Sequence, residues 1–356
     1  YDIMHFEALG KEAEFLKNIT EELKKKGSLP ASFTSLITPL TIQEYLKENT
    51  VDLPDIITTK THSKFPDAYV NNGIKKSVIT RSAGYDHFEH LQYKINLASL
   101  REYCIDAVAQ TAIKFLYCTA GNLNEYSYNT KVFERKNTKS FMELGKNRVA
   151  TVYGVGKIGK RVYEDLEANG LTVQAVDIRE NELKQLPEYK NCHFTDRDTA
   201  IANSDILINV MNLTKDKNSR FYNEGYFDEK YLLKAKKPLI FINVTRGEIA
   251  PEATLLKLYR EGKITGIAAD VFSQEAELTD YLRANDFTGC RNENILAAKE
   301  IIDEALSRKS NFYVQPHQGF NSDIAAKTKA AEAMNHVVFW LNNGKDHFKE
   351  QLPYYK

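Results

Sequence analysis

Three side chains in the second half of the chain, Arg246, Glu275 and His317, are of types that carry anion binding and proton transfer. Each follows a short run of apolar or β-branched residues, such as residues 238–244 and 263–272, that is typical of a buried strand. In an open sheet of parallel strands, ligands bind at the carboxyl ends of the strands. The three side chains are therefore predicted to lie at one edge of a sheet.

This set of side chains suits the interconversion of a 2-keto acid and a 2-hydroxy acid. A guanidinium can form paired hydrogen bonds with a carboxylate and its neighbouring carbonyl oxygen. An imidazole can protonate the forming alkoxide or accept the hydroxyl proton in the opposite direction, and a carboxylate beside it can tune it. Taken singly, Arg246 could be a surface arginine, Glu275 a solvated side chain and His317 a structural histidine. Their joint occurrence with the nucleotide motif described next favours the catalytic interpretation.

The motif GVGKIG, which begins at Gly154, has the spacing of a dinucleotide-binding loop. An isolated motif of this kind is weak evidence, but the strand pattern VATVY precedes it and the helical pattern KRVYEDLEANG follows it. Gly154 permits the tight turn, Gly156 lets the backbone approach a pyrophosphate, and Gly159 lets helix and strand pack closely. Lys157 and Ile158 open the helix, whose N-terminal N–H groups and dipole favour phosphate.

A carboxylate, Asp177, ends the next strand, 18 residues after Gly159. At this place a carboxylate accepts hydrogen bonds from the adenosine ribose of NAD and repels the 2′-phosphate of NADP, so NAD is the predicted cofactor. Arg179 leaves some use of NADP open, because a nearby arginine can bind that phosphate. Asp270, at the end of a later strand, is also expected to contact the cofactor. The motif alone leaves two alternatives, a βαβ unit without a ligand and a methyltransferase-type fold.

Strand and helix patterns alternate along the whole chain, which is typical of parallel α/β domains. Besides the segments named above, buried strands are expected at residues 55–59, 77–82 and 205–210. Helices are expected at residues 11–27 and 41–49, from about residue 103, and from about residue 322 to Gly344.

At 356 residues the chain exceeds the size at which one hydrophobic core keeps growing. The simplest architecture has two Rossmann-like α/β domains with parallel sheets, in which the nucleotide-binding domain is inserted into a substrate-binding domain made from both chain ends. We expect the substrate-binding domain at 1–101 and 322–356, and the NAD-binding domain at 102–321.

Charge and cysteine content exclude several classes of protein. Lys+Arg and Asp+Glu are both 48, so no excess of positive charge favours nucleic acid or an anionic membrane surface. No apolar run approaches membrane-spanning length, and the first residues lack a signal-peptide pattern. The four cysteines show no CxxC pairing, so neither a metal site nor a disulfide framework is expected. We therefore expect a cytoplasmic protein whose partner is a small molecule.

From about residue 50 onward the chain resembles the D-isomer-specific 2-hydroxyacid dehydrogenase family. The segments VYGVGKIGKRV, INVTRGE, ADVFSQE and QPHQGFN resemble its signature regions in order. By that resemblance, Arg246 binds and polarises the substrate, His317 is the general acid/base, and Glu275 orients and charges it. Departures from the family pattern, such as Gln318 and Gly319 after the histidine, leave the substrate open.

The resemblance extends to the first part of the chain. VITRSAGYDHFE looks like the family's substrate loop, so backbone amides near Ala83 and Gly84 are expected to hold the substrate carboxylate. Tyr103 matches a position that lines the substrate pocket in the D-lactate dehydrogenase branch. The resemblance also implies a homodimer built through the cofactor domain.

The predicted function is NAD-dependent reduction of a small 2-keto acid to the D-2-hydroxy acid. A non-catalytic NAD-sensing scaffold of the same fold is one alternative, because such a protein can retain the catalytic set. A dehydrogenase for another acid, such as phosphoglycerate, formate or phosphite, is the second. No basic cluster stands out in the sequence, so a small uncharged or apolar substituent on the keto acid is expected.

Overall fold

The computed structural model describes residues 1–355, which form two compact units. Unit 1 consists of Tyr1–Cys104 together with the chain from Asn321 onward, and unit 2 consists of Ile105–Phe320. These divisions lie within three residues of the expected boundaries. Both units are parallel α/β layers, so the predicted fold class is confirmed. None of the helices in the described part of the chain is long and apolar enough to cross a bilayer.

Unit 1 is built on a five-stranded parallel sheet in the order β2-β1-β3-β4-β5. Its strands are β1 (Ile3–His5), β2 (Ser35–Ile37), β3 (Ile56–Thr59), β4 (Ser77–Thr80) and β5 (Asn96–Ser99). Its helices are α1 (Gly10–Lys25), α2 (Ile42–Glu48), α3 (Asp67–Val70), the 3₁₀ turn η1 (Glu89–Leu91) and α13 (Ala325–Asn342).

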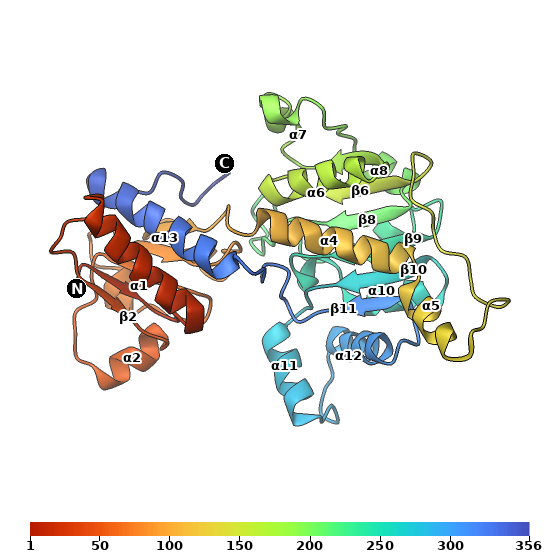
Figure 1. Cartoon of the computed structure of the whole chain (residues 1–356), viewed down its shortest axis with the longest axis horizontal. Helices are drawn as coiled ribbons and strands as arrows, with labels where there is room; N and C mark the ends of the chain where they lie inside the picture. The colour runs from red at the N-terminus through yellow and green to blue at the C-terminus, as the bar shows by residue number, and fades with distance from the viewer. Residues whose placement is uncertain (356) are drawn as a thin grey trace. The chain divides into compact units, whose positions relative to one another are not determined.

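Both faces of the central strands of this sheet are buried, so successive side chains of β1, β3, β4 and β5 are buried without alternation, small polar ones included. Successive residues of β3, Ile56 and Ile57, enter two different core clusters. One cluster lies under α1 and α13, which pack side by side although they come from opposite ends of the chain (Figure 1). The other lies under α2, α3 and η1. The N- and C-terminal segments therefore share one domain.

Unit 2 is built on a six-stranded parallel sheet in the order β11-β10-β9-β8-β6-β7. Its strands are β6 (Val149–Tyr153), β7 (Thr172–Val176), β8 (Ile206–Asn209), β9 (Leu239–Asn243), β10 (Ile264–Ala269) and β11 (Phe312–Val314). A parallel bridge between Ala175 and Phe194 adds a rudimentary strand outside β7. The strand order reverses between β6 and β8, and this is where ligands bind in open α/β sheets.

Helices cover both faces of the second sheet, and α4 packs along α6 (Figure 1). The helices of unit 2 are α4 (Ile105–Ala120), α5 (Leu123–Asn129), α6 (Lys157–Ala168), α7 (Glu180–Leu183), α8 (Arg197–Asn203), α9 (Glu229–Leu232), α10 (Glu252–Arg260), α11 (Glu275–Ala284) and α12 (Glu293–Leu306), with 3₁₀ turns η2 (Thr130–Val132), η3 (Pro187–Tyr189) and η4 (Gly247–Ile249).

Candidate active site

The glycine motif forms the turn from β6 into α6 that its sequence predicts. Gly154 has φ +84, and a Cβ there would meet the backbone of Met211 at 2.8 Å. A Cβ on Gly159 would lie 1.9 Å from the carbonyl oxygen of Gly154, so helix and loop can approach only through glycine. Gly156 is the N-cap of α6 and has no side-chain cap, so the first N–H groups of the helix stay available to an anion.

Asp177 lies directly after β7, beside the glycine loop. Its carboxylate accepts hydrogen bonds from the amide of Val155 (2.8 Å), from the amide of Arg179 (2.9 Å), and from the Arg179 guanidinium at 3.0 and 2.8 Å. Both side chains are largely buried. Arg179 is the residue because of which the sequence alone does not exclude binding of NADP. Its guanidinium forms two hydrogen bonds with Asp177, the carboxylate that is expected to contact the ribose.

The three predicted catalytic side chains follow neighbouring strands, β9, β10 and β11, whose carboxyl ends lie at one edge of the sheet. Arg246 lies after β9, and its guanidinium donates to the Thr245 carbonyl oxygen at 2.8 Å. Asn243 holds this turn through its side-chain amide, which donates to the Arg246 carbonyl oxygen at 3.0 Å. A Cβ on Gly247 would lie 2.0 Å from the carbonyl carbon of Phe272, so only glycine lets the loops after β9 and β10 pack this closely.

His317 and Glu275 form a direct pair, with 2.8 Å between the imidazole Nδ1 and the carboxylate Oε2. Glu275 is the first residue of α11 and His317 comes three residues after β11. Each side chain remains more than a third exposed. A carboxylate on Nδ1 fixes the tautomer of the ring and leaves Nε2 as the atom that can exchange a proton with a ligand.

Asp270 holds the loop that carries His317. Its carboxylate accepts hydrogen bonds from the Gln315 side chain (2.8 Å) and from the amides of Gln318 (2.7 Å) and Gly319 (2.8 Å). Its carbonyl oxygen accepts from the His317 amide at 2.7 Å. Burial raises the pKa of this carboxyl. The hydrogen bonds from Gln315, Gly319 and Gln318 and the nearby His317 lower the pKa, but burial has the larger effect. All of these contacts are to the loop, and the contact with the cofactor that the sequence leads us to expect stays a prediction.

A second buried acid, Glu252 at the start of α10, supports the segment between Asp270 and Glu275. Its Oε1 accepts a hydrogen bond from the Ser273 amide at 2.6 Å. Burial raises the pKa of Glu252 to about 7, although the bonds to Ser273 work in the opposite direction. Nothing in the sequence indicates this role, because an acidic residue in the first turn of a helix is ordinary.

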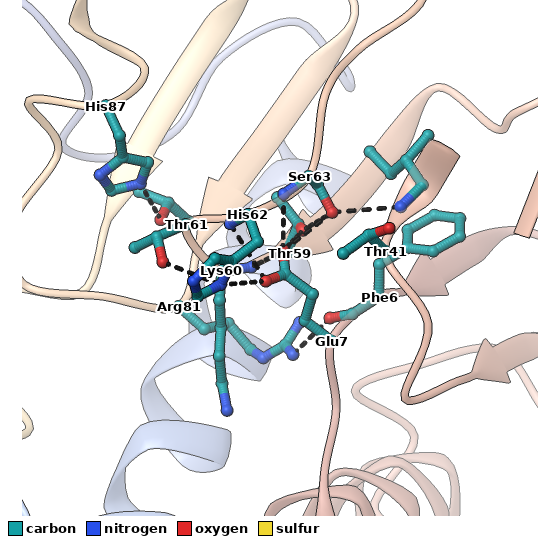
Figure 2. Close-up of polar contacts among 12 residues, drawn as sticks. Phe6, Glu7, Thr41, Thr59, Lys60, Thr61, His62, Ser63, Arg81 and His87 are labelled. Carbon is teal, nitrogen blue, oxygen red and sulfur yellow. Dashed lines mark hydrogen bonds and ion pairs between the residues drawn. The ribbon is translucent and has the colours of Figure 1, made fainter. Parts of the chain in front are cut away.

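Unit 1 carries the residues expected to bind the substrate carboxylate. Ala83 and Gly84 lie in the bend after β4, half-buried. Arg81, just before them, is fully buried and donates to Glu12 Oε1 at 2.8 Å and to the Phe6 carbonyl oxygen at 2.6 Å, a bond that is drawn in Figure 2. This buried ion pair supports the start of the bend.

Tyr103 lies at the end of the first segment of unit 1. Its amide donates to Glu332 at 2.8 Å, and the ammonium of Lys329 lies 4.9 Å from the centre of its ring. The ring packs against the core cluster under α1 and α13, and burial raises the pKa of its hydroxyl. The expectation that Tyr103 lines the substrate pocket stays a prediction.

The NAD-binding domain of the D-isomer-specific 2-hydroxyacid dehydrogenases, as a family model, matches residues 115–319. The chain belongs to this family. It is accordingly an NAD-dependent oxidoreductase. A D-lactate dehydrogenase of Staphylococcus epidermidis is 25% identical over 316 residues, which cover 85% of this chain and 89% of that protein. A glyoxylate reductase of Thermofilum pendens is 29% identical over 230 residues, covering 62% of this chain and 64% of that protein.

A solved structure of a D-lactate dehydrogenase has the same fold as this chain. The D-lactate dehydrogenase of Aquifex aeolicus, crystallised with NAD and lactic acid, superposes with a TM-score of 0.73 at 19% identity and covers 98% of both chains. In the present dehydrogenase the glycine loop fits NAD, because α6 lacks a side-chain cap and the backbone at Gly156 is open to a ligand. Beyond its chain neighbours, the first atom that a Cβ on Gly156 would meet is Nη2 of Arg179, at 3.8 Å.

Sequence reasoning missed several residues that shape the candidate site. Asn209 and Asn243 are buried and joined by a side-chain hydrogen bond of 3.0 Å, which links the ends of β8 and β9 behind Arg246. The signal was present, since two asparagines end otherwise apolar strands, and a buried amide needs a specific partner. Gly247 and Glu252 carried no such signal, because their importance depends on contacts with the loop after β10.

Proposed function

We propose that this dehydrogenase reduces a small 2-keto acid to the D-2-hydroxy acid with NADH. The observation that carries the proposal is the 2.8 Å pair between His317 and Glu275 at the edge of the NAD-binding sheet. When bound, the nicotinamide supplies the hydride. The protonated imidazole then gives its Nε2 proton to the forming alkoxide, and in the oxidative direction the neutral ring accepts the hydroxyl proton.

Further residues are proposed to bind the substrate and the cofactor. Arg246 binds the keto acid through paired hydrogen bonds and stabilises the negative charge that develops on the carbonyl oxygen. Backbone amides near Ala83 and Gly84 hold the substrate carboxylate. Asp177 serves the adenosine ribose, while Lys157 and Ile158 open the helix that faces the pyrophosphate.

The test is oxidation of NADH by the purified protein with 2-keto acids of graded length, followed by determination of the chirality of the product. We expect turnover with at least one acid and a D-hydroxy product. A protein that binds NADH tightly but turns over none of the acids would instead be the NAD-sensing scaffold. An L-hydroxy product would contradict the proposed arrangement of hydride and acid.

We also propose that unit 2 forms a homodimer through an exposed apolar surface. The side chains that make up this surface belong to α4, α5 and the segment after them: Tyr117, Leu123, Tyr126, Tyr128, Val132, Phe133 and Phe141. Monomeric proteins rarely expose so many neighbouring large apolar side chains, so a second copy of the chain is the proposed occupant.

A cytoplasmic location is proposed from the cysteines. All four, Cys104, Cys118, Cys192 and Cys290, are free thiols, two of them buried. Reduced, unpaired cysteines are typical of a reducing compartment.

A further inference from the structure

The loop that carries His317 begins with Gln315, the first residue after β11. The side-chain amide of Gln315 joins two charged side chains of unit 2. Its Nε2 donates to Asp270 Oδ1 at 2.8 Å, and its Oε1 accepts from Nζ of Lys114 on α4 at 2.7 Å. The sequence does not indicate this bridge, because the three residues lie far apart in the chain and a polar residue after a strand is ordinary.

The two charged partners fix the orientation of the Gln315 amide. A lysine ammonium has only donors, so Lys114 bonds to the oxygen of the amide and not to its NH₂ group. The NH₂ group then faces Asp270, and an ionised carboxylate has only acceptors. The hydrogen bonds therefore run in one direction, from Lys114 through Gln315 to Asp270.

Asp270 receives hydrogen bonds on both of its carboxylate oxygens. Oδ1 accepts from Gln315 and from the Gln318 amide at 2.7 Å, and Oδ2 accepts from the Gly319 amide at 2.8 Å. Asp270 is 2% exposed, so these donors take the place of water. A proton on the carboxyl would weaken all three bonds, because hydrogen bonds to an ionised group are roughly twice as strong as neutral ones. The hold of Asp270 on the loop therefore depends on its charge.

The charge of Asp270 depends in turn on Gln315. Burial raises the pKa of Asp270, and among the groups that lower this pKa the Gln315 side chain has the largest effect, ahead of two backbone amides and His317. His317 is the titratable group that faces Asp270 from the loop, and Lys114 acts on it from α4 through Gln315. The loop after β9 contributes no charge here, since the neighbouring Asn243 only accepts from the Asp270 amide, at 2.9 Å.

Helix α4 contacts both ends of this loop. The helix packs across β9, β10 and β11 (Figure 1). Thr111 and Lys114 are three residues apart and therefore face the same side of α4. Lys114 reaches Gln315, and Thr111 Oγ1 donates to the Gly319 carbonyl oxygen at 3.3 Å. A Cβ on Gly319 would lie 2.6 Å from Asp270 Oδ2, which gives a physical reason for this departure from the family pattern.

We propose that Gln315 is a positioning residue for His317 and that it acts by keeping Asp270 charged. The inference rests on the proposed function, in which His317 exchanges a proton with the substrate. The charged Asp270 holds the two amides that follow His317 in the chain. The loop in turn keeps the imidazole at 2.8 Å from Glu275. When Asp270 is protonated, its hold on the loop weakens and proton transfer slows.

Two substitutions of Gln315 test the proposal through the pH profile of turnover. Q315M has a similar length but no donor, and Q315E keeps the shape while it places a second carboxylate beside Asp270. Both favour the protonated form of Asp270, and Q315E does so more strongly, because like charges held close disfavour ionisation.

The measurement is kcat with NADH and the 2-keto acid that the wild type reduces fastest. The charge of Asp270 is present above its pKa and lost as the pH falls through it. We therefore expect kcat to fall, on acidification, at a pH at least about one unit higher in Q315E than in the wild type, with Q315M between the two.

Two further variants separate this effect from a change in overall charge. K114M removes the cation that orients the amide, and should shift the fall in kcat in the same direction by a smaller amount. Gln185 is exposed and follows α7, at the opposite edge of the sheet from β11, so Q185E should leave the profile unchanged. The same profile in Q315E as in the wild type, or an equal shift in Q185E, would overturn the proposal. An unchanged profile in K114M would contradict the orienting role of Lys114.

Amide hydrogen exchange distinguishes this proposal from the proposed function, because it requires no turnover. At pH 5, after correction for intrinsic rates, we expect the amides of Gln318 and Gly319 to exchange at least about tenfold faster in Q315E than in the wild type. Mass spectrometry of the peptide that contains the loop measures this difference. If exchange increases but the wild type reduces none of the acids, the proposed function fails and the link from Gln315 to the loop stands. If the acids are reduced but neither exchange nor the pH profile changes in Q315E, the present proposal fails alone.

Discussion

At the scale of single residues, His317 is held in a backbone conformation that non-glycine residues seldom adopt. Its φ is +52, which costs on the order of 1–3 kcal/mol unless neighbouring groups hold it. Here the Asp270 carbonyl oxygen accepts from the amide of His317, and the Asp270 carboxylate accepts from the next two amides in the chain. The held backbone and the contact of Nδ1 with Glu275 together give the imidazole one defined direction, which the proposed acid/base role requires.

We predict that H317Q lowers kcat for keto-acid reduction by on the order of 10²- to 10⁴-fold, the usual effect of losing a general acid/base. E275Q keeps the shape of its side chain but loses its charge, and should lower kcat by at least about tenfold, because the 2.8 Å contact with the imidazole no longer stabilises the protonated ring. Steady-state kinetics measure both. NADH binding, followed by fluorescence, should persist in each variant, and near-normal turnover of H317Q would remove His317 from the mechanism.

The contact between Arg179 and Asp177 leads to a prediction about the choice of cofactor. An unpaired carboxylate would repel the 2′-phosphate of NADPH, but here the guanidinium neutralises it through two bonds of 3.0 and 2.8 Å. We therefore expect NADH to be preferred only moderately in the wild type. R179A should expose the carboxylate and weaken NADPH binding by about tenfold relative to NADH.

Fluorescence titration with the two reduced cofactors measures this ratio directly. D177N is the complementary variant, since it removes the repelling charge, and it should bring the two dissociation constants closer together. If R179A tightens NADPH binding, Arg179 does not reduce the repulsion between Asp177 and the 2′-phosphate.

At the scale of elements, the segment that links β10 to α11 depends on a buried acid. Glu252 is 3% exposed, and its Oε2 has no hydrogen-bond partner in the described chain. Its pKa of about 7 in the folded protein lies above the ordinary value of 4.5, so folding favours the protonated form. The stability that this group contributes is therefore fully present below about pH 4.5 and is lost as the pH rises to about 7.

We predict that E252Q raises the thermal unfolding midpoint at pH 8 and has little effect at pH 5. The gain in the free energy of unfolding at pH 8 should be on the order of 1–3 kcal/mol, because the variant no longer has to hold a buried charge. E261Q is the control, since Glu261 is an exposed glutamate at the end of the same helix and should show no such pH dependence. Equal shifts at both pH values for E252Q would mean that Glu252 does not titrate on folding.

The elements themselves differ in how far the sequence predicts them. Strands such as β9 are continuous apolar runs, and α1 shows clear helical spacing, so both are found close to where they were expected. By contrast β1, β2 and β5 have three or four residues each, too few to establish a period, and they exist because neighbouring strands and helices bury them.

The residues of the candidate site likewise differ in how far the sequence predicts them. Strand ends predict that Arg246, Glu275 and His317 share one edge, because parallel strands place their carboxyl ends together. Contacts that depend on tertiary packing were not predictable. Asp270 bonds to its own neighbouring loop, a set of contacts that nothing in the sequence indicates, and its expected contact with the cofactor stays a prediction.

At the scale of the whole molecule, the apolar surface around α5 contrasts with an otherwise balanced chain that has 48 basic and 48 acidic residues. With no net charge to keep copies apart, apolar contacts decide whether two chains associate. Val132 and Phe133 are the most exposed members of this surface, at 76% and 77%. Placing a carboxylate at the centre of an apolar interface leaves a buried, unpaired charge, which costs several kcal/mol.

We predict that wild-type protein elutes as a dimer and that V132D/F133D elutes as a monomer, as measured by size-exclusion chromatography with light scattering. Leu306 provides a matched control, because it is 75% exposed at the end of α12, outside this surface, so L306D should remain dimeric. Circular dichroism must show native helix content in each variant, since loss of the fold would also abolish association. A monomeric wild type, or a V132D/F133D variant that stays dimeric, would exclude this surface as the interface. Because every residue of the surface lies outside the proposed catalytic set, the monomer should still bind NADH, which separates assembly from cofactor binding.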